Sequence, residues 1–223
     1  MKRPARPRRA AAVPLPAGVP AGGADSFHIR GVVVAINAQL LEVLTQGARQ
    51  ASPVFPLPPR QRERFAQLTP ESCERIAHCS VLLVEAGFTD HQRWTAACGH
   101  ASIATEAGSS IPWLSAAEGV ALAQTTLLLA WHVCQTQVAA ASVLLGMSPA
   151  VAALMAKRPV RDLTRLAREH SDWILPRWSD QPDIWDSLLD LSARVAYEDP
   201  ICLSTRGLQL SGRQMQGAQT TVR

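Results

Sequence analysis

Residues 115–146 read SAAEGVALAQTTLLLAWHVCQTQVAAASVLLG, and this stretch decides the fold class. It opens on Ser115-Ala116-Ala117-Glu118, the S-x-x-E pattern of a helix capping box, and closes on Gly146, a residue typical of helix C-termini. The pattern predicts one helix over 115–145, about 45 Å long at 1.5 Å per residue. Because that is long for a chain of 223 residues, we expect the helix to pack against a partner or across both halves of its own chain.

Shorter helices are predicted on both sides of this stretch, and prolines mark the start of several of them. The expected helices cover 32–48, 60–67, 69–79, 90–97, 148–157, 159–170 and 183–196. Two apolar pieces, 81–84 and 173–175, are expected to be extended. The predicted fold class is therefore all-α or mostly α, with short extended segments.

Composition and element order divide the chain. Residues 1–26 are rich in Pro, Ala, Gly and Arg and predict a disordered basic arm, and 200–223 form a tail without a strong pattern. The small and polar segment 99–112 is interpreted as the boundary between two helical units, 27–110 and 111–199.

The two units show the same element order, which predicts a tandem duplication, a covalent version of a homodimer. Chance alignment of two helical halves is the alternative. A shift of 90 residues, with a one-residue gap before the last pair, aligns Pro59 with Pro149, Phe65-Ala66 with Met155-Ala156, Arg75-Ile76-Ala77 with Arg165-Leu166-Ala167, Phe88 with Trp178, and Trp94 with Trp185.

Three motifs of the second half resemble a known family. They are Leu144-Leu145-Gly146-Met147-Ser148, Leu163-Thr164-Arg165-Leu166-Ala167 and Trp173-Ile174-Leu175-Pro176-Arg177-Trp178. Together with the long helix before them, over 118–190, they resemble FlhD, the smaller subunit of the bacterial flagellar master activator. Residues 36–98 resemble the same pattern more weakly, and they also resemble FlhD-like regulators of integrative conjugative elements.

The resemblance implies two tandem FlhD-like repeats that serve as a non-catalytic subunit of a heteromeric transcriptional activator. Such a subunit assists a larger FlhC-like partner in binding promoter DNA, with RNA polymerase as a further candidate partner. In that family zinc sits in the larger subunit. This chain has Ile174 where the family has a Cys that can link two subunits, and Pro176 where the family has an aromatic. Nothing after Pro200 is typical of a helix-turn-helix, so we expect assisted DNA binding.

The net charge of +4 is concentrated in two places. Removing the five basic residues of the first nine leaves 17 basic and 18 acidic residues, a net charge of −1. The second place is one face of the predicted helix over 159–170, extended by the residue before it. Four arginines there are spaced 3, 4 and 3 residues apart, and we call them the arginine stripe: Arg158, Arg161, Arg165 and Arg168. Guanidinium groups suit phosphate oxygens, although a solvated helix face or an acidic partner would also explain the stripe. The candidate DNA contacts are Lys2, Arg3, Arg6, Arg8 and Arg9 of the arm, Arg158, Arg161, Arg165 and Arg168 of the stripe, and Arg177 of the third motif.

Large apolar side chains are the candidates for partner contact, because they supply most of the buried area at interfaces. We predict this role for Leu127, Leu128, Trp131 and Trp178. A protein-interaction adaptor or anti-activator that never contacts DNA is the alternative function. The oligomeric state, homo- or hetero-oligomer, and the regulated genes, flagellar or conjugative, stay open.

Catalysis and cofactors are not predicted. Six residues could be considered as zinc ligands, but their spacing matches no standard zinc site: Cys73, His78, Cys79, His91, Cys98 and His100. No nucleophile motif and no phosphate-binding glycine loop occurs in the sequence. Five cysteines without a C-x-x-C pair favour the cytoplasm. The most apolar run, 119–133, is too short and too often interrupted for a membrane span.

Overall fold

The computed structural model describes the backbone of residues 22–99 and 113–194 and the side chains of 28–99 and 113–193. This part is mostly helical, which confirms the predicted fold class. The first half contains α1 (Gly22–Arg49), α2 (Pro59–Ala66), α3 (Pro70–Ala77), β1 (Val84–Glu85) and α4 (His91–Cys98). The second half contains α5 (Ala116–Thr136), α6 (Val138–Leu145), α7 (Pro149–Ala156), α8 (Val160–Glu169), a 3-10 turn (Ser171–Trp173), β2 (Leu175–Pro176) and α9 (Pro182–Arg194).

Local sequence explains most helix starts. The predicted capping box is present: the Glu118 amide donates to Ser115 Oγ at 3.3 Å, and the Ser115 amide donates to Glu118 Oε2 at 3.1 Å. Thr69 and Ser148 each accept a hydrogen bond from the third residue of the helix that follows, and a proline occupies the first turn of both helices.

The predicted continuous helix over 115–145 is wrong. It is two helices, because Gln137 leaves the helical region with φ −146° and ψ 65°. No Pro or Gly stands at the break, so the sequence carries no local signal that one helix ends and another begins there. The turn brings the carbonyl of Leu144, near the end of α6, to the amide of Leu82 in the first half at 2.8 Å.

The helix α1 is longer than predicted. It begins at Gly22, inside the segment 1–26 that the sequence predicts to be a disordered basic arm. Residues His28–Arg49 are long and apolar enough to cross a membrane, but 44% of the most apolar window is buried inside the protein. Leu40, Leu41 and Leu44 are fully enclosed in the core, as in the central helix of a globular domain.

The structure repeats its elements in the same order in both halves. The offset is 90 residues between α2 and α7 (Pro59 to Pro149) and 91 residues between β1 and β2 (Val84 to Leu175) and between α4 and α9 (His91 to Pro182). The extra residue therefore lies before the strands, in the region of the 3-10 turn, and not before Trp94 as aligned from sequence. The alignment of Phe88 with Trp178 is wrong, because Trp178 (φ 59°) has the left-handed backbone of Gly87 (φ 65°).

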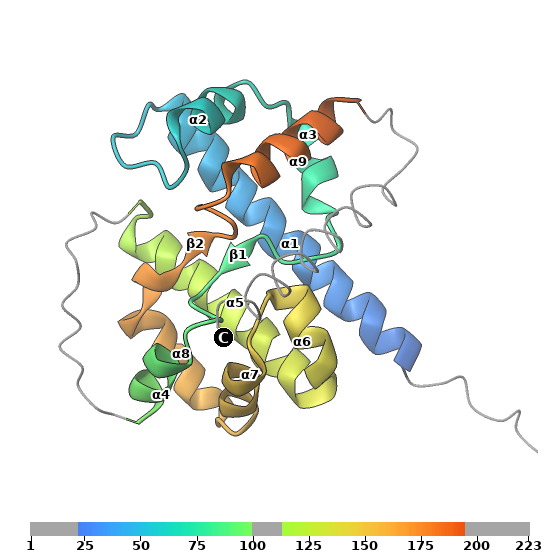
Figure 1. The fold of residues 1–223 in the computed structure, drawn as a ribbon, viewed down its shortest axis with the longest axis vertical. Coiled ribbons are helices and arrows are strands. Elements are labelled where there is room, and N and C mark those ends of the chain that lie inside the picture. Colours follow the sequence, from blue (N-terminus) through green and yellow to red (C-terminus); the bar gives the residue numbers. More distant parts are fainter. Residues whose placement is uncertain (1–21, 100–112, 195–223) are drawn as a thin grey trace, which may run out of the picture.

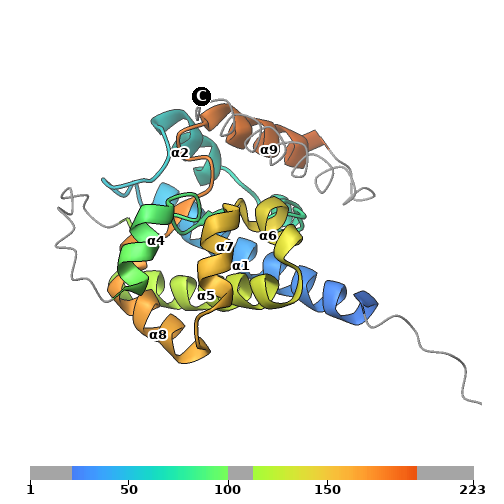
Figure 2. The same ribbon diagram turned by 60° about the horizontal axis from the view of Figure 1, so that its bottom comes forward.

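The two halves exchange their last helices. Figure 1 shows α9, from the second half, lying over α2 and α3, while α4, from the first half, lies beside α7 and α8; Figure 2 shows the same grouping from another side. At the centre β1 pairs with β2 in antiparallel register, Val84 with Pro176 and Glu85 with Leu175. Since α1 also packs on α5, one continuous hydrophobic core joins the halves.

Candidate functional site

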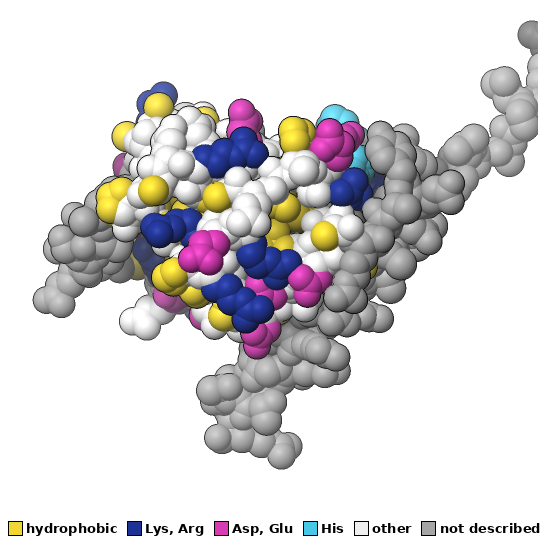
Figure 3. Space-filling view, turned by 90° about the horizontal axis from the view of Figure 1, so that it is seen from above, with side chains coloured by type: hydrophobic (Ala, Val, Ile, Leu, Met, Phe, Trp, Pro, Cys, Tyr) yellow, Lys and Arg dark blue, Asp and Glu magenta, His cyan; other side chains and the backbone are white. Residues whose placement is uncertain are grey.

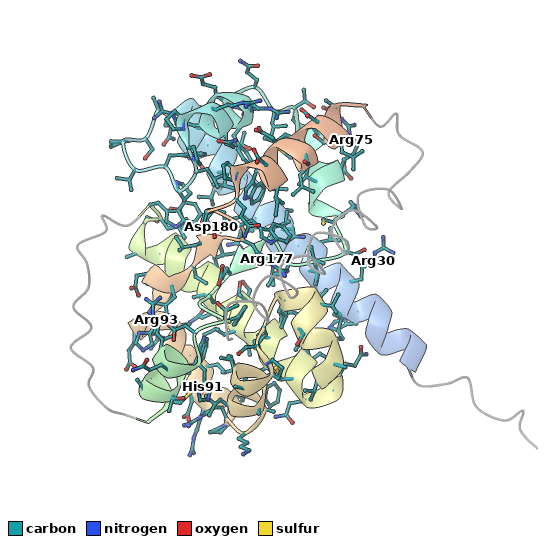
Figure 4. The ribbon with its side chains drawn as sticks, in the orientation of Figure 1. Arg30, Arg75, His91, Arg93, Arg177 and Asp180 are labelled. Carbon is teal, nitrogen blue, oxygen red and sulfur yellow. The ribbon has the colours of Figure 1, made fainter. Side chains whose placement is uncertain are left out.

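Arg177 lies at the centre of the molecule, between the two exchanged groups of helices (Figure 4). Its residue is 1% exposed, and Nη1 donates to the carbonyls of Leu82 and Leu144 at 3.3 Å each. The guanidinium also lies over the Trp178 ring, 4.6 Å from its centroid. Arg177 thus joins the two halves from inside, and its predicted contact with DNA is wrong because the side chain cannot reach the surface.

Burial governs the ionisation of this centre. Burial lowers the pKa of Arg177 to about 10, against the attraction of Glu85 and Cys79. Burial also raises the pKa of the Glu85 carboxyl and of the Cys79 thiol, and Arg177 counteracts both shifts. The arrangement is a buried charge that donates to two carbonyls and is attracted by the Glu85 carboxyl, which suits a structural role.

The arginine stripe is only partly free. Arg158 lies outside α8, because Pro159 is the N-cap of that helix. The Arg158 side chain is half-buried. Arg165 pairs with Glu169 at 2.5 Å, one turn along the helix, and a weaker pair joins Arg161 to Asp162 at 3.9 Å. Arg161 and Arg168 are exposed and project from α8. The stripe therefore offers two well-exposed guanidinium groups, and DNA contact by it stays a prediction.

Two of the four predicted partner contacts are wrong. Leu127 and Trp178 are 4% and 1% exposed, because both lie in the core of this chain. Leu128 is 46% exposed and remains available to a partner. Trp131 is half-buried, and its indole N–H donates to the carbonyl of Arg158 at 2.8 Å, so it fills a space within its own chain.

The basic arm lies outside the described residues. The DNA contacts predicted for Lys2, Arg3, Arg6, Arg8 and Arg9 therefore stay predictions. The segment 100–112, which contains most of the predicted unit boundary, and the tail 200–223 lie outside them too.

A polar interface that sequence reasoning missed joins α9 to α2 and α3. Arg64 bridges Asp186 at 2.7 Å and Asp190 at 2.5 Å, and Arg75 Nε donates to the carbonyl of Ser192 at 2.9 Å. Its partners lie more than 110 residues apart, so no local pattern indicates them. Figure 3, which views this side of the molecule, shows basic and acidic side chains interspersed and no continuous basic surface.

The exchanged helix α4 carries an aromatic cluster. The Arg93 guanidinium lies over the Trp173 ring, with Cζ 4.2 Å from the ring centroid, and the His170 imidazole stacks on Trp173 with centroids 4.2 Å apart. The Trp94 and Trp173 rings meet in a T-shaped arrangement with centroids 5.4 Å apart. Burial lowers the pKa of His170. These contacts fasten α4 to the 3-10 turn of the second half and leave no open cavity of useful size, because the space enclosed there is about 10 Å³.

Metal-ligating groups and thiols are the reactive side chains that the described residues offer for comparison. No group of three or more His, Cys, Asp or Glu side chains that could hold a metal occurs among them. Burial raises the pKa of the Cys98 thiol and, to about 11, that of Cys134, so both thiols stay protonated near neutral pH.

A groove between α1 and α3 has a volume of about 800 Å³. Val34, Ala38, Leu68, Cys73 and Ala77 supply its apolar walls, and we call it the α1–α3 groove. No motif predicts it, because it depends on which side chains are small at positions on two separate helices.

Comparison with known proteins gives no relative for this chain: no family model, no curated protein and no solved structure matches it. The resemblance to FlhD therefore stays a prediction.

Proposed function

We propose that this protein is a non-catalytic, FlhD-like subunit of a heteromeric transcriptional activator that assists a larger FlhC-like partner in binding promoter DNA. The observation that supports it is the exchange of α4 and α9 about a shared core, which builds the equivalent of a dimer from one chain. Such a core offers two related but unequal outer faces to a partner.

The motifs behind the family resemblance fit this proposal. Leu144, Gly146 and Arg177 come from two of the three motifs, and they meet where the halves join. Because these motif residues lie in the interior where the two halves meet, the resemblance favours an architecture shared with FlhD rather than a surface shared with it. It supports a subunit role more than it supports any particular DNA contact.

The charges favour assisted over autonomous DNA binding. Arg161 and Arg168 are exposed, whereas Arg165 is paired and Arg177 is buried. The two exposed arginines of the stripe neutralise too few phosphates for tight binding by the stripe alone, since affinity grows with each neutralised phosphate. The partner would supply most of the sequence readout.

The adaptor or anti-activator remains the second candidate, because Figure 3 shows mixed charges on the face that it views. In this function the chain binds a regulator and never touches DNA. The arginine stripe would then be a solvated surface.

A gel-shift titration separates the two functions. The full chain, alone and with the FlhC-like protein of the same organism, is titrated onto a labelled promoter fragment at several salt concentrations. We expect binding only with the partner, and the double variant Arg161→Glu/Arg168→Glu should weaken it about tenfold and lower the salt slope by about 2. The control Arg30→Glu/Arg60→Glu alters exposed arginines of α1 and α2 and should leave binding unchanged.

Two outcomes would overturn the proposal. Tight, sequence-specific binding by the chain alone would make it an autonomous DNA-binding protein. Undiminished partner binding together with identical promoter binding by both double variants would favour the adaptor.

A further inference from the structure

The α1–α3 groove has a counterpart in the second half, and the pairing of helices identifies it. Shifting α1 by 86 residues superimposes its buried positions on those of α5. The buried pairs are Val33 and Gly119, Ile36 and Leu122, Asn37 and Ala123, Leu40 and Thr126, Leu41 and Leu127, Leu44 and Ala130, and Ala48 and Cys134. Since α3 corresponds to α8, the counterpart of the groove lies between α5 and α8.

In the second half this place is filled. Trp131 of α5 is the counterpart of Thr45, and its half-buried indole reaches the start of α8, where its N–H donates to the carbonyl of Arg158. Gln135 Nε2 donates to the carbonyl of Ala156 beside it. On α8 the counterpart of Cys73 is Leu163, which is buried in the core.

In the first half the same place is empty of an aromatic ring. Thr45 reaches only to Cys73, with Oγ1 and Sγ 3.6 Å apart. The carbonyls of Ala66 and Leu68, counterparts of those of Ala156 and Arg158, accept hydrogen bonds from Arg49 at 3.4 and 2.8 Å. The backbone frame is thus the same in both halves, and the first half lacks the ring that the second half supplies.

We propose that the α1–α3 groove binds an aromatic side chain presented by a segment of a partner protein, in the place that Trp131 fills in the other half. The volume of about 800 Å³ lies within the range of sites that bind small organic groups. An aromatic ring suits it because rings gain the most from burial in apolar walls. The proposal deepens the proposed function, on which it rests for the existence of a partner.

The charges at the rim specify the segment further. Two carboxylates, Glu42 and Glu74, line the groove with exposed side chains, against the single guanidinium of Arg49. Arg49 is held by the two carbonyls at one end. The rim is therefore mildly acidic, and we expect a Lys or Arg next to the aromatic residue of the partner segment.

Small indoles test the site without any partner. Tryptamine, which is cationic, 3-methylindole, which is neutral, and indole-3-acetate, which is anionic, are titrated into the ¹⁵N-labelled full chain and followed by amide chemical shifts. We expect shifts confined to residues lining the groove, a dissociation constant of about 1 mM for tryptamine, and binding that weakens about threefold at each step to neutral and anionic indole.

Two variants and one control complete the design. Thr45→Trp, which copies the second half, should fill the groove and weaken tryptamine binding at least tenfold. Ala38→Arg, at an exposed position of the rim, should do the same without altering a buried side chain. The control Gln92→Trp adds an indole at an exposed position of α4 and should leave binding unchanged.

Three results would overturn the proposal. One is the absence of saturable shifts in the groove, and another is equal binding by the wild type and Ala38→Arg. The third is a matching displacement of amide signals from 195–223, which would mean that the tail of this chain is the natural occupant. A failed gel shift with intact tryptamine binding would instead reject the proposed function and keep the site.

Discussion

Replacing Gly146 by alanine is expected to destabilise the protein by about 4 kcal/mol. Gly146 ends α6 with φ 68°, a backbone conformation that costs other residues about 1–2 kcal/mol. A Cβ added there would lie 2.5 Å from Nη2 and 2.8 Å from Cζ of Arg177. The guanidinium would have to move away from the carbonyls of Leu82 and Leu144, and disturbing a buried charge costs about 3–5 kcal/mol.

Urea unfolding followed by circular dichroism measures this loss, and the midpoint of thermal unfolding should fall by about 10 °C. Gly31→Ala is the matched control. Gly31 lies within α1 with nothing within 4 Å of an added Cβ, so alanine there should stabilise the helix by about 0.5–1 kcal/mol. A loss below 1 kcal/mol for Gly146→Ala would show that the Arg177 guanidinium does not lie against Gly146 where the two halves meet.

Replacing Asn37 by leucine is expected to cost about 4 kcal/mol. Asn37 is fully buried on α1, and its Nδ2 donates to the carbonyls of Ala77 at 3.2 Å and Val81 at 3.0 Å. Its Oδ1 accepts from the amide of Leu83 at 2.8 Å. Leucine has a similar shape but leaves three buried backbone groups without this partner, at about 1–3 kcal/mol for each group.

The same unfolding experiment measures the effect, with Gln46→Leu as control. Gln46 is an exposed amide on the same helix, where substitutions usually change stability by about 0.5 kcal/mol or less. Similar stabilities for the two variants would mean that α1 does not hold the turn between α3 and β1. A large loss confined to Asn37→Leu supports the core as described.

The sequence predicted what depends on neighbouring residues. Ser115, Thr69 and Ser148 satisfy amides within their own first turns, so their patterns identified three helix starts. The repeated element order was also detectable from sequence, because a proline occupies the first turn of both α2 (Pro59) and α7 (Pro149). Each of these features is settled within a few residues along the chain.

Features that depend on distant residues were missed. In the sequence Arg177 resembles a surface arginine. It is buried because the carbonyls of Leu82 and Leu144, from different halves, come together in the fold and accept its hydrogen bonds. Asn37 looks like an ordinary polar position of a helix, because its three partners lie 40 to 46 residues away. The exchange of α4 and α9 leaves no trace in a periodic pattern, which is the same whichever half a helix packs against.

The same limit applies to the candidate site. Trp131 was predicted as a partner contact because it is a large apolar residue in a long helix. In the structure its indole N–H donates to the carbonyl of Arg158 within the same chain, and Thr45 stands at the corresponding position of the first half. The α1–α3 groove exists because Thr45 replaces a tryptophan of the other half. Such a difference is visible only when the two halves are compared in space, so no sequence motif predicts it.

The exchange of helices within one chain is the central claim, and a single nuclear magnetic resonance experiment tests it most directly. Phe65 of α2 and Trp185 of α9 meet edge to face with ring centroids 5.6 Å apart, although they come from different halves. We predict nuclear Overhauser effects between these rings in uniformly labelled protein and none in an isotope-filtered spectrum of mixed labelled and unlabelled chains. Contacts of Trp185 with Met155, the counterpart of Phe65 in its own half, or an intermolecular signal in the mixed sample, would contradict it.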